Sequence, residues 1–546
     1  MKVVSEYKLK SSFIFFLFLI GYAIILLNLY LIQVWNNKYF VQLAERQYQV
    51  TVTQLSPRGL ILDRNGKLLA FNKENLSAFV LPKQIENPEK TIQFLKENFP
   101  EGLARLKQAD NKHFIFIKRK LTQKQIKLIK ESEIEDIKFI KESSRFYTSQ
   151  SLGPIVGLTN IDNVGQFGME GIFNKQLSGE PTTLVLEKDA RSMKYYFEKE
   201  TTSNGIEPKN IQLTIDKDLQ FLIHEELKET IEKFDAKEGA VLVLNPSTGE
   251  ILSMAQYPSF NPNWIDKIDL EKTKNKLTVD AYELGSVMKT FVALAALEEG
   301  VVELDEIINC DNTKEGKVNG MKFTTWMAQG EIPFSEVFER SNNIGIAKVA
   351  QRLGPTLYDY YSRLGFGKKT DVEVLGEQAG FITHPSNWSK RSLISLSFGY
   401  EVRATLLQLA QAMAIISNEG ILVPPRLLFV KDSEKKSEKL FSKKSINQIK
   451  ELLSNTVKRG TAFRASINGY NIMGKTGTAN LLVDKQYSPT NNIYTFAGII
   501  EQDDYKRVIV TFVKEVKKSG LYASTVAVPL FEKVAEKTLI HDKVSR

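Results

Sequence analysis

Cysteine and histidine are scarce in this chain of 546 residues. The one cysteine, Cys310, has no partner for an intrachain disulfide, and a cysteine-rich metal site is excluded. The four histidines (His113, His224, His384 and His541) are not paired at the spacing of zinc ligands. With 32 glycines and 17 prolines, the chain is neither collagen-like nor of low complexity. The composition indicates a globular protein, and we expect no metal and no other cofactor.

The excess of one charge sign is modest. Lysine and arginine number 73 against 64 acidic residues, which gives a net charge of +9. This charge suits an anionic surface such as a membrane or a polyanion, but it identifies neither. The basic stretch from Leu121 to Ile134 is predicted to be an amphipathic helix with a solvated lysine face, so we expect no nucleic-acid partner.

One long apolar run is present, from Phe13 to Val34, and no second run of 18 apolar residues follows. As a helix the run would span about 33 Å, enough to cross the hydrocarbon core of a bilayer. Lys2, Lys8 and Lys10 precede it, which indicates a cytoplasmic N-terminus. A cleaved signal peptide starts in the same way, but this run is long for one and no Ala-x-Ala site follows. We predict an uncleaved, single-pass anchor in the bacterial inner membrane, with the rest of the chain on the periplasmic side.

The pattern of predicted elements changes near residue 206. Residues 35–205 alternate short strand-like runs, such as Phe114–Ile117, with polar helices. Beyond them, strands are followed by a helical block and then by strands again, which predicts an α+β domain whose sheet is built from both ends of the segment. We therefore predict a cytoplasmic tail (1–12), an anchor (13–34), a first extracytoplasmic domain (35–205) and a second one (206–546).

The elements of the second domain can be placed by periodicity and turn signals. Asn245–Gly249 is predicted to be a turn, and the charged run Lys431–Lys444 an exposed loop. The predicted strands are Ile211–Ile215, Ala240–Leu244, Glu250–Met254, Tyr494–Ile500 and Arg507–Val513, and the predicted helices are Lys217–Phe234 and segments within 285–300, 334–364, 404–418 and 524–539.

A serine nucleophile here needs an activating group other than histidine. The chain has no Gly-x-Ser-x-Gly motif, so a Ser-His-Asp hydrolase is disfavoured. A lysine amine one helical turn from the serine can serve instead, because an apolar site lowers the pKa of the amine and lets it act as a base. The Ser-x-x-Lys pattern occurs three times, at Ser5–Lys8, Ser286–Lys289 and Ser433–Lys436.

Ser286 stands out by its context, Glu283-Leu-Gly-Ser-Val-Met-Lys289. The segment after Ser286 is apolar nearly all round, which is typical of a buried helix, and Gly285 allows a tight turn into it. A serine at a helix N-terminus lies where free amides and the helix dipole favour developing negative charge. Taken alone, the motif also fits a helix-capping serine with a lysine that reaches the surface.

Two further motifs follow in order. Ser341-Asn342-Asn343 lies 55 residues after Ser286, and Lys475-Thr476-Gly477-Thr478 lies 134 residues beyond that. On an edge strand, the second motif offers a cation, hydroxyls and a close backbone approach at its glycine. Such a strand can hold a carboxylate and present an amide to an oxyanion. Alone, each motif is weak, and Lys-Thr-Gly also fits a β-turn.

Together, in this order and outside a membrane anchor, the three motifs resemble those of the class B penicillin-binding proteins, the monofunctional peptidoglycan D,D-transpeptidases. The division-specific, FtsI-like branch is the most similar. The resemblance implies a pedestal at 35–205, and at 206–546 a transpeptidase domain with a central antiparallel sheet, flanking helices and an all-helical subdomain. It extends over nearly the whole chain through Arg58–Gly66, Gly157–Asp162, Gly168–Gly171, Gly399-Tyr400, Leu407–Ala410 and Asn418–Gly420.

The resemblance also implies catalytic roles. Ser286 would be the acylated nucleophile and Lys289 its base. Ser341 would help to relay the proton, and Asn343 would bind the peptide amide of the substrate. Lys475 would complete the polar network, and the amide of Ser286 would form one half of the oxyanion hole.

The implied substrate is a peptidoglycan stem peptide that ends in D-Ala-D-Ala. Thr476 and Thr478 would hold its terminal carboxylate beside Gly477, and the amide of Thr478 would complete the oxyanion hole. Acylation would release the last D-Ala, and an amine of a neighbouring stem would then form the cross-link. β-Lactam antibiotics would mimic the substrate. The implied partners are an FtsW-like polytopic glycosyltransferase and other division proteins, contacted through Phe13–Val34 and the pedestal.

Three positions depart from the family pattern. Leu284 stands where a proline usually precedes the first motif, and Glu401 and Leu406 replace an expected glycine and proline. We expect Leu284 to loosen the entry into the helix without removing a reacting group, and Glu401 and Leu406 to affect the shape of the groove more than its chemistry. The region before residue 205 lacks the paired acidic motifs of a glycosyltransferase, so a class A protein is disfavoured.

Other functions share some of these features. A D,D-carboxypeptidase or a β-lactamase also forms an acyl-serine, although the extended region 35–205 favours the transpeptidase. A non-catalytic envelope scaffold would keep the fold without the chemistry. A membrane-anchored polyanion binder depends on the net charge alone.

Overall fold

The computed structural model describes residues 2–54, 57–108, 114–188, 195–203, 205–264, 268–429, 437–483, 486–518 and 520–545. His113 and the third Ser-x-x-Lys pair, Ser433 and Lys436, lie outside these ranges. The chain divides into two compact units. The first comprises Met1–Pro57 and Ser178–Pro208, and the second comprises Arg58–Leu177 and Lys209–Arg546.

The first unit begins with the apolar helix α1 (Lys2–Tyr30), which continues into a π-helical turn, η1 (Leu31–Trp35). Among the described residues, Tyr7–Trp35 is the one helix that is long and apolar enough to cross a membrane. Its side chains are exposed nearly throughout, as expected of a helix that lipid surrounds. The predicted long apolar helix near the N-terminus is thus confirmed, and its length and composition suit a single-pass anchor. The unit also contains α2 (Asn37–Tyr48) and an antiparallel sheet in the order β1 (Gln49–Gln54), β8 (Thr182–Lys188) and β9 (Tyr195–Ser203).

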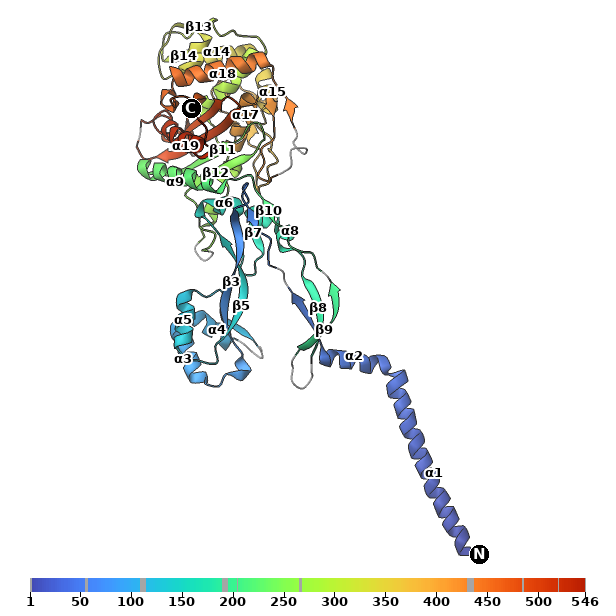
Figure 1. Ribbon diagram of the computed structural model, residues 1–546. Helices are drawn as coiled ribbons and strands as arrows, with labels where there is room; N and C mark the ends of the chain where they lie inside the picture. Colours follow the sequence, from blue (N-terminus) through green and yellow to red (C-terminus); the bar gives the residue numbers. More distant parts are fainter. Residues whose placement is uncertain are drawn as a thin grey trace. The chain divides into compact units, whose positions relative to one another are not determined.

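The N-terminal part of the second unit is organised around the long strand β3 (Leu68–Val80), which pairs with β2 (Ile61–Leu62), β4 (Ile115–Lys118) and β5 (Lys138–Tyr147). At the far end of β3 lie three helices, α3 (Pro88–Asn98), α4 (Pro100–Lys107) and α5 (Gln123–Glu131) (Figure 1). Apolar side chains from these helices and from β3 and β4 share one small core. The short elements here are η2 (Pro82–Gln84), η3 (Gln150–Leu152), α6 (Gly153–Val156), β6 (Leu158–Thr159), β7 (Gly165–Phe167), α7 (Gly168–Ile172) and α8 (Asn174–Ser178).

The segment Arg58–Gly66, which carries the resemblance to the family signature, contributes one of the three residues of a buried ion cluster. The Nε atom of Arg58 lies 2.6 Å from Oε2 of Glu170, and Nε of Arg145 lies 2.5 Å from Oε1 of the same carboxylate. The side chains of all three residues are almost completely buried. Since Arg58 begins the unit, Arg145 lies on β5 and Glu170 lies on α7, the cluster joins three segments that are far apart in the sequence.

The main sheet of the second unit is antiparallel, with the order β12 (Ile251–Tyr257), β11 (Ala236–Leu244), β23 (Tyr505–Val516), β22 (Gln486–Gln502) and β21 (Asn471–Val483). Its two faces are covered by different helices (Figure 1). On β23, Ile509 and Val513 pack with α9 (Lys217–Phe234) and α19 (Ala527–His541). The alternate residues, Val508 and Val510, belong to the core that includes α12 (Lys289–Glu298) and α17 (Leu406–Ser417). Successive side chains of the strand point to opposite faces of the sheet, so β23 contributes to both cores.

This sheet is assembled from both ends of the segment, and the predicted α+β class is confirmed. The helical block between its two halves also carries short two-stranded pairings. Its remaining elements are α10 (Leu270–Thr273), α11 (Lys276–Val279), η5 (Gly285–Met288), β13 (Ile307–Asn309), β14 (Glu315–Val318), β15 (Met321–Thr324), β16 (Glu331–Pro333), α13 (Phe334–Glu339), α14 (Asn343–Leu353), α15 (Thr356–Arg363), β17 (Phe381–Ile382), η6 (Pro385–Asn387), α16 (Ser392–Ser397), β18 (Val402–Arg403), β19 (Ile421–Leu422), β20 (Glu438–Lys439), α18 (Lys443–Lys458) and η8 (Phe463–Ala465).

Several predicted elements differ in extent. The strand predicted at Ile211–Ile215 is β10 (Ile211–Gln212) only, because Asp216 already caps α9 by accepting from the amides of Asp218 and Leu219. The helical stretch 334–364 is broken into three, at Ser341 and Gly354, which both have a positive φ.

For the described residues 437–444, the prediction of an exposed loop at Lys431–Lys444 is confirmed in exposure for most positions but wrong about part of their structure. Residues 431–436 lie outside the described ranges, but β20 and the first turn of α18 occupy part of the rest. The side chain of Ser442 caps α18 by accepting from the amide of Ser445, and Phe441 is buried. Charge alone predicted exposure and missed the cap that starts a helix.

Candidate active site

Ser286 lines a cleft of about 1090 Å³ in the second unit. Residues of η5, the start of α14, the segment after α18 and the edge strand β21 form its walls. Of the predicted site residues, Ser286, Ser341, Asn343, Thr476 and Thr478 line this cleft. Within the described part of the chain, no group of three or more His, Cys, Asp and Glu side chains could hold a metal ion.

The strand β21 approaches the nucleophile segment backbone to backbone. A Cβ atom at Gly477 would lie 2.4 Å from the carbonyl oxygen of Leu284, and one at Gly285 would lie 2.6 Å from that of Thr478. Gly285 also has a φ of +62°, which side chains disfavour. Both glycines are therefore required for the strand to lie this close to Ser286.

The sequence predicted that Ser286 and Lys289 lie one turn apart on a regular α-helix, and the structure differs. Ser286 lies in the 3₁₀ turn η5, and Lys289 is the first residue of α12. In a 3₁₀ turn the side chains at i and i+3 are eclipsed, so the spacing still directs both to one side. Ser286 is half-buried at the cleft, whereas Lys289 is completely buried behind it.

The amine of Lys289 is surrounded by neutral oxygens. Its Nζ atom donates to Oδ1 of Asn343 at 2.6 Å, to the carbonyl oxygen of Ser341 at 2.8 Å and to Oγ of Ser341 at 3.2 Å. Burial, and after it the charge of Lys475, lowers the pKa of Lys289 well below its usual value of 10.5. A buried ammonium without a carboxylate partner is costly, so the neutral amine is favoured.

In the Ser341-Asn342-Asn343 motif, Asn342 has a structural role, whereas Ser341 and Asn343 line the cleft. Asn342 is buried and caps α14, since its side chain accepts from the amides of Ile344 and Gly345. Ser341 is held at a φ of +56°, a strained conformation for a residue with a side chain. Asn343 is fixed by donating from Nδ2 to the carbonyl oxygen of Thr324 at 2.7 Å. No role was predicted for Asn342, although an asparagine before a helix is a common cap.

Lys475 lies on β21 and is completely buried. Burial lowers the pKa of Lys475 from 10.5 to about 7. Its Nζ atom lies 5.8 Å from the centre of the Phe338 ring and 3.4 Å from the carbonyl oxygen of Thr476. The structure thus places Lys475 beneath the cleft and within electrostatic range of Lys289, but it records no hydrogen bond from Lys475 to Ser286 or Ser341.

The two threonines of the third motif have partners of their own. Oγ1 of Thr476 lies 3.0 Å from Oγ1 of Thr461, and Oγ1 of Thr478 accepts from the amide of Ala523 at 3.0 Å. Thr461 and Ala523 also line the cleft. These contacts orient both hydroxyls on the exposed side of β21, next to Ser286.

Sequence reasoning missed several residues of the cleft. Arg459 lines it and forms a two-point ion pair with the buried Glu339, with both N–O distances at 2.8 Å. Trp326, Phe463 and Tyr522 are exposed at its edge. None of them belongs to a motif, and only the fold brings them to Ser286, so no local signal identified them.

Two of the three departures from the family pattern, Glu401 and Leu406, have local explanations. Glu401 has a φ of +58°, a conformation that glycine adopts without strain. Its amide donates to Oε1 of Glu283 at 2.9 Å, which ties it to the nucleophile segment. Leu406 is the first residue of α17, a position that suits proline, and Thr405 caps this helix.

Comparison with known families now decides the assignment. The family described as "Penicillin binding protein transpeptidase domain" matches residues 239–536, more than half of the chain. The chain belongs to the penicillin-binding proteins. A second family, "Penicillin-binding Protein dimerisation domain", matches residues 53–213. The two matches together confirm the predicted class B assignment.

Curated relatives agree with this assignment. "Probable peptidoglycan D,D-transpeptidase PenA" of Neisseria meningitidis is 31% identical over 496 residues, which cover 89% of this penicillin-binding protein and 84% of the relative. "Peptidoglycan D,D-transpeptidase FtsI" of Escherichia coli is 28% identical over 487 residues, which cover 87% and 82% of the two chains. The predicted similarity to the FtsI-like branch is consistent with these names.

Solved structures share the fold. Penicillin-binding protein 3 from Mycobacterium tuberculosis, complexed with aztreonam, has a TM-score of 0.70 at 23% identity and covers 90% of this chain and 98% of its own. A peptidoglycan synthetase from Bifidobacterium adolescentis has a TM-score of 0.71 at 20% identity, with 91% and 97% of the two chains covered.

Proposed function

We propose that this penicillin-binding protein is a peptidoglycan D,D-transpeptidase that cross-links stem peptides through an acyl-enzyme at Ser286. The observation that carries the proposal is the amine of Lys289, which is completely buried, held by neutral oxygens and located behind the cleft that Ser286 lines. Such an amine, with its pKa well below the usual value, can act as a base, which the protonated amine of a solvated lysine cannot.

In the acylation step, Oγ of Ser286 attacks the carbonyl carbon between the two D-alanines and transfers its proton to Nζ of Lys289. The amides of Ser286 and Thr478 stabilise the oxyanion that forms. When the C–N bond breaks, the departing amine of D-Ala takes the proton back by way of Ser341. An ester to Ser286 and free D-Ala result, and the step needs no cofactor.

In the second step, an amine of a neighbouring stem attacks the ester carbonyl. A new amide bond forms, the bond to Oγ of Ser286 breaks, and the proton of the attacking amine returns to Ser286 through Lys289.

The remaining site residues hold the substrate. Asn343 exchanges its bond to Thr324 for one to the peptide amide of the stem. The positive side chain of Lys475 and the hydroxyls of Thr476 and Thr478 bind the terminal carboxylate, and Gly477 leaves room for it beside β21.

β-Lactams bind as mimics of the D-Ala-D-Ala end and remain attached to Ser286. Membership of the transpeptidase family supports this substrate class and this inhibitor class. The relatives named FtsI support a role in septal cell-wall synthesis.

We further propose the division of the chain into a cytoplasmic tail (1–12), an anchor (13–34), a non-catalytic pedestal (35–205) and the transpeptidase domain (206–546). The lysines before the anchor support a cytoplasmic N-terminus and a periplasmic catalytic domain. The partners are an FtsW-like polytopic glycosyltransferase and other division proteins. The exposed apolar surface of α1 supports a helix–helix contact within the membrane.

A cross-linking assay tests the activity directly. The full chain, in detergent or lipid, is given lipid-linked glycan strands with D-Ala-D-Ala stems together with an amine acceptor. We expect released D-Ala in equal amount to dimeric stem peptide, and neither product with Ser286→Ala. Release of D-Ala with water as the sole acceptor would indicate a carboxypeptidase and contradict the proposal. A folded wild-type chain without any release would indicate a scaffold.

A further inference from the structure

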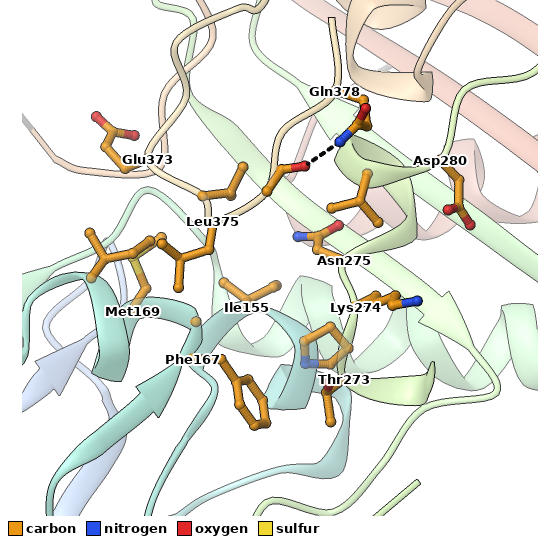
Figure 2. A pocket seen from close by; sticks show the side chains of 16 residues that line it. Ile155, Phe167, Met169, Thr273, Lys274, Asn275, Asp280, Glu373, Leu375 and Gln378 are labelled. Carbon is orange, nitrogen blue, oxygen red and sulfur yellow. Dashed lines mark hydrogen bonds between the residues drawn. The ribbon is translucent and has the colours of Figure 1, made fainter. Parts of the chain in front are cut away.

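A second cavity, of about 440 Å³, lies in the second unit and shares no lining residue with the Ser286 cleft. Figure 2 shows its three walls. One wall comes from α6, β7 and α7, another from residues 273–280 with α11, and the third from the loop 373–378. The cavity thus lies where the N-terminal part of this unit meets its catalytic part.

The floor of the cavity is apolar. Ile155 and Met169 are almost completely buried beneath it, and Phe167 is packed edge-on against Phe260. Leu375 stands at the rim with 53% of its surface exposed. Exposed apolar side chains around an apolar hollow are typical of an interaction site.

The rim of the cavity carries a surplus of negative charge. Asp280 and Glu373 contribute carboxylates to the lining. Lys274 is the one basic lining residue, and its Nζ atom is already paired with both oxygens of the exposed Glu271, at 2.8 and 2.9 Å. This pairing leaves the two carboxylates as the excess charge of the lining. Each already accepts one hydrogen bond, Asp280 from the hydroxyl of Tyr282 at 3.2 Å and Glu373 from the amide of Leu427 at 2.9 Å.

The cavity is preformed, since its walls are tied to one another. The amide of Gln378 donates to the carbonyl oxygen of Thr278 at 2.9 Å, which joins the loop to the segment that ends in α11. A Cβ atom at Gly171 would lie 3.6 Å from Cδ1 of Leu375, so the loop also rests on α7. A preformed site spares its ligand the cost of ordering the walls.

We propose that this cavity is a docking site for a partner polypeptide that inserts an apolar side chain followed by a lysine or arginine. The apolar side chain lies on Ile155, Met169 and Phe167, and the basic group pairs with Asp280, on the opposite side of the cavity from Glu373 (Figure 2). Charge complementarity selects this occupant over a phosphate or a carboxylate ligand, which the same rim repels. The volume is near the lower end of the roughly 300–1000 Å³ of ligand sites, so it holds one or two side chains and not a folded domain.

The test uses the full chain in lipid nanodiscs and a panel of fluorescein-labelled hexapeptides. Each peptide carries Leu or Phe at its third position, followed by Lys, Gln or Glu, and binding is followed by fluorescence anisotropy against empty nanodiscs. We expect at least one Lys peptide to bind saturably and at least tenfold more tightly than its Glu counterpart. Asp280→Asn should reduce this ratio, because it removes one of the two carboxylates.

Leu375→Arg should weaken binding of the Lys peptide at least tenfold. Phe381→Arg is the matched control, because Phe381 is similarly exposed, at 57%, but does not line the cavity, and this variant should bind within twofold of the wild type. The proposal would be overturned by the absence of saturable binding across the panel, by equal affinity for the Lys, Gln and Glu peptides, or by equal losses in the two arginine variants. If the bound fraction of the peptide falls as the protein concentration is raised, a second copy of the chain competes for the cavity, and this result would also overturn the proposal. The measurement does not involve Ser286, so it stands apart from the proposed activity.

Discussion

The Nζ atom of Lys289 lies 2.6 Å from Oδ1 of Asn343, a residue 54 positions further along the chain. A second bond from the same nitrogen reaches the carbonyl oxygen of Ser341 at 2.8 Å. A neutral lysine amine has two N–H donors and one lone pair, and these two acceptors use both donors. The lone pair then faces the third neighbour, the hydroxyl of Ser341 at 3.2 Å, from which a neutral amine accepts and through which it can exchange a proton.

Replacement of Lys289 by methionine should slow acylation by penicillin about 10²- to 10⁴-fold, because a general base typically contributes that much. Methionine keeps most of the buried volume of the side chain, so the fold should persist. Stopped-flow measurement with a fluorescent penicillin gives the rate, and thermal unfolding of both proteins verifies the fold. A folded Lys289→Met chain with a near-normal rate would refute the role of the amine.

Removal of the charge at Lys475 should move the pH dependence of acylation to higher pH. The positive charge of Lys475 helps to lower the pKa of Lys289. Lys475→Gln removes that repulsion, so Lys289 holds its proton to a higher pH. The midpoint of the rise in acylation rate with pH should therefore move to a higher pH. Lys475→Arg keeps the charge and is the control. An unchanged or lowered midpoint in Lys475→Gln would contradict the coupling, whatever the loss of rate.

The buried carboxylate of Glu170 should matter far more for stability than an exposed one. Glu170→Gln leaves the guanidinium groups of Arg58 and Arg145 buried without a counter-charge, and we expect a loss of about 3–5 kcal/mol in the free energy of unfolding. The control is Glu74→Gln. Glu74 pairs with Lys141 at 3.1 Å, with about three quarters of both side chains exposed, and its loss should cost about 0–1 kcal/mol. Urea unfolding of the second unit in the full chain measures both, and equal effects would refute the role of burial.

Elements with strong local signals were predictable from the sequence. The helix Lys217–Phe234 has the predicted bounds, because Asp216 caps its start and its apolar positions repeat with helical spacing. For Lys475 the sequence left an edge strand and a β-turn open, and the structure decides for the strand, because β21 is the last strand of the sheet. The membrane segment was recognisable by length and apolarity alone.

Features that depend on long-range contacts were not predictable. Ser341 breaks the helical stretch 334–364 because it is held at a positive φ, and its local sequence contains no glycine or proline that announces the break. Arg459 reaches the cleft through its pair with Glu339, 120 residues earlier in the chain. The cavity at Leu375 combines three distant segments, none of which carries a motif for it.

The most direct test of the acyl-serine account is the intact mass of the full chain after exposure to a penicillin, with the modified residue located by peptide mass spectrometry. The account predicts a single adduct on the peptide that contains Ser286, and no adduct with Ser286→Ala. An adduct on another residue, or none on the folded wild-type chain, would contradict it.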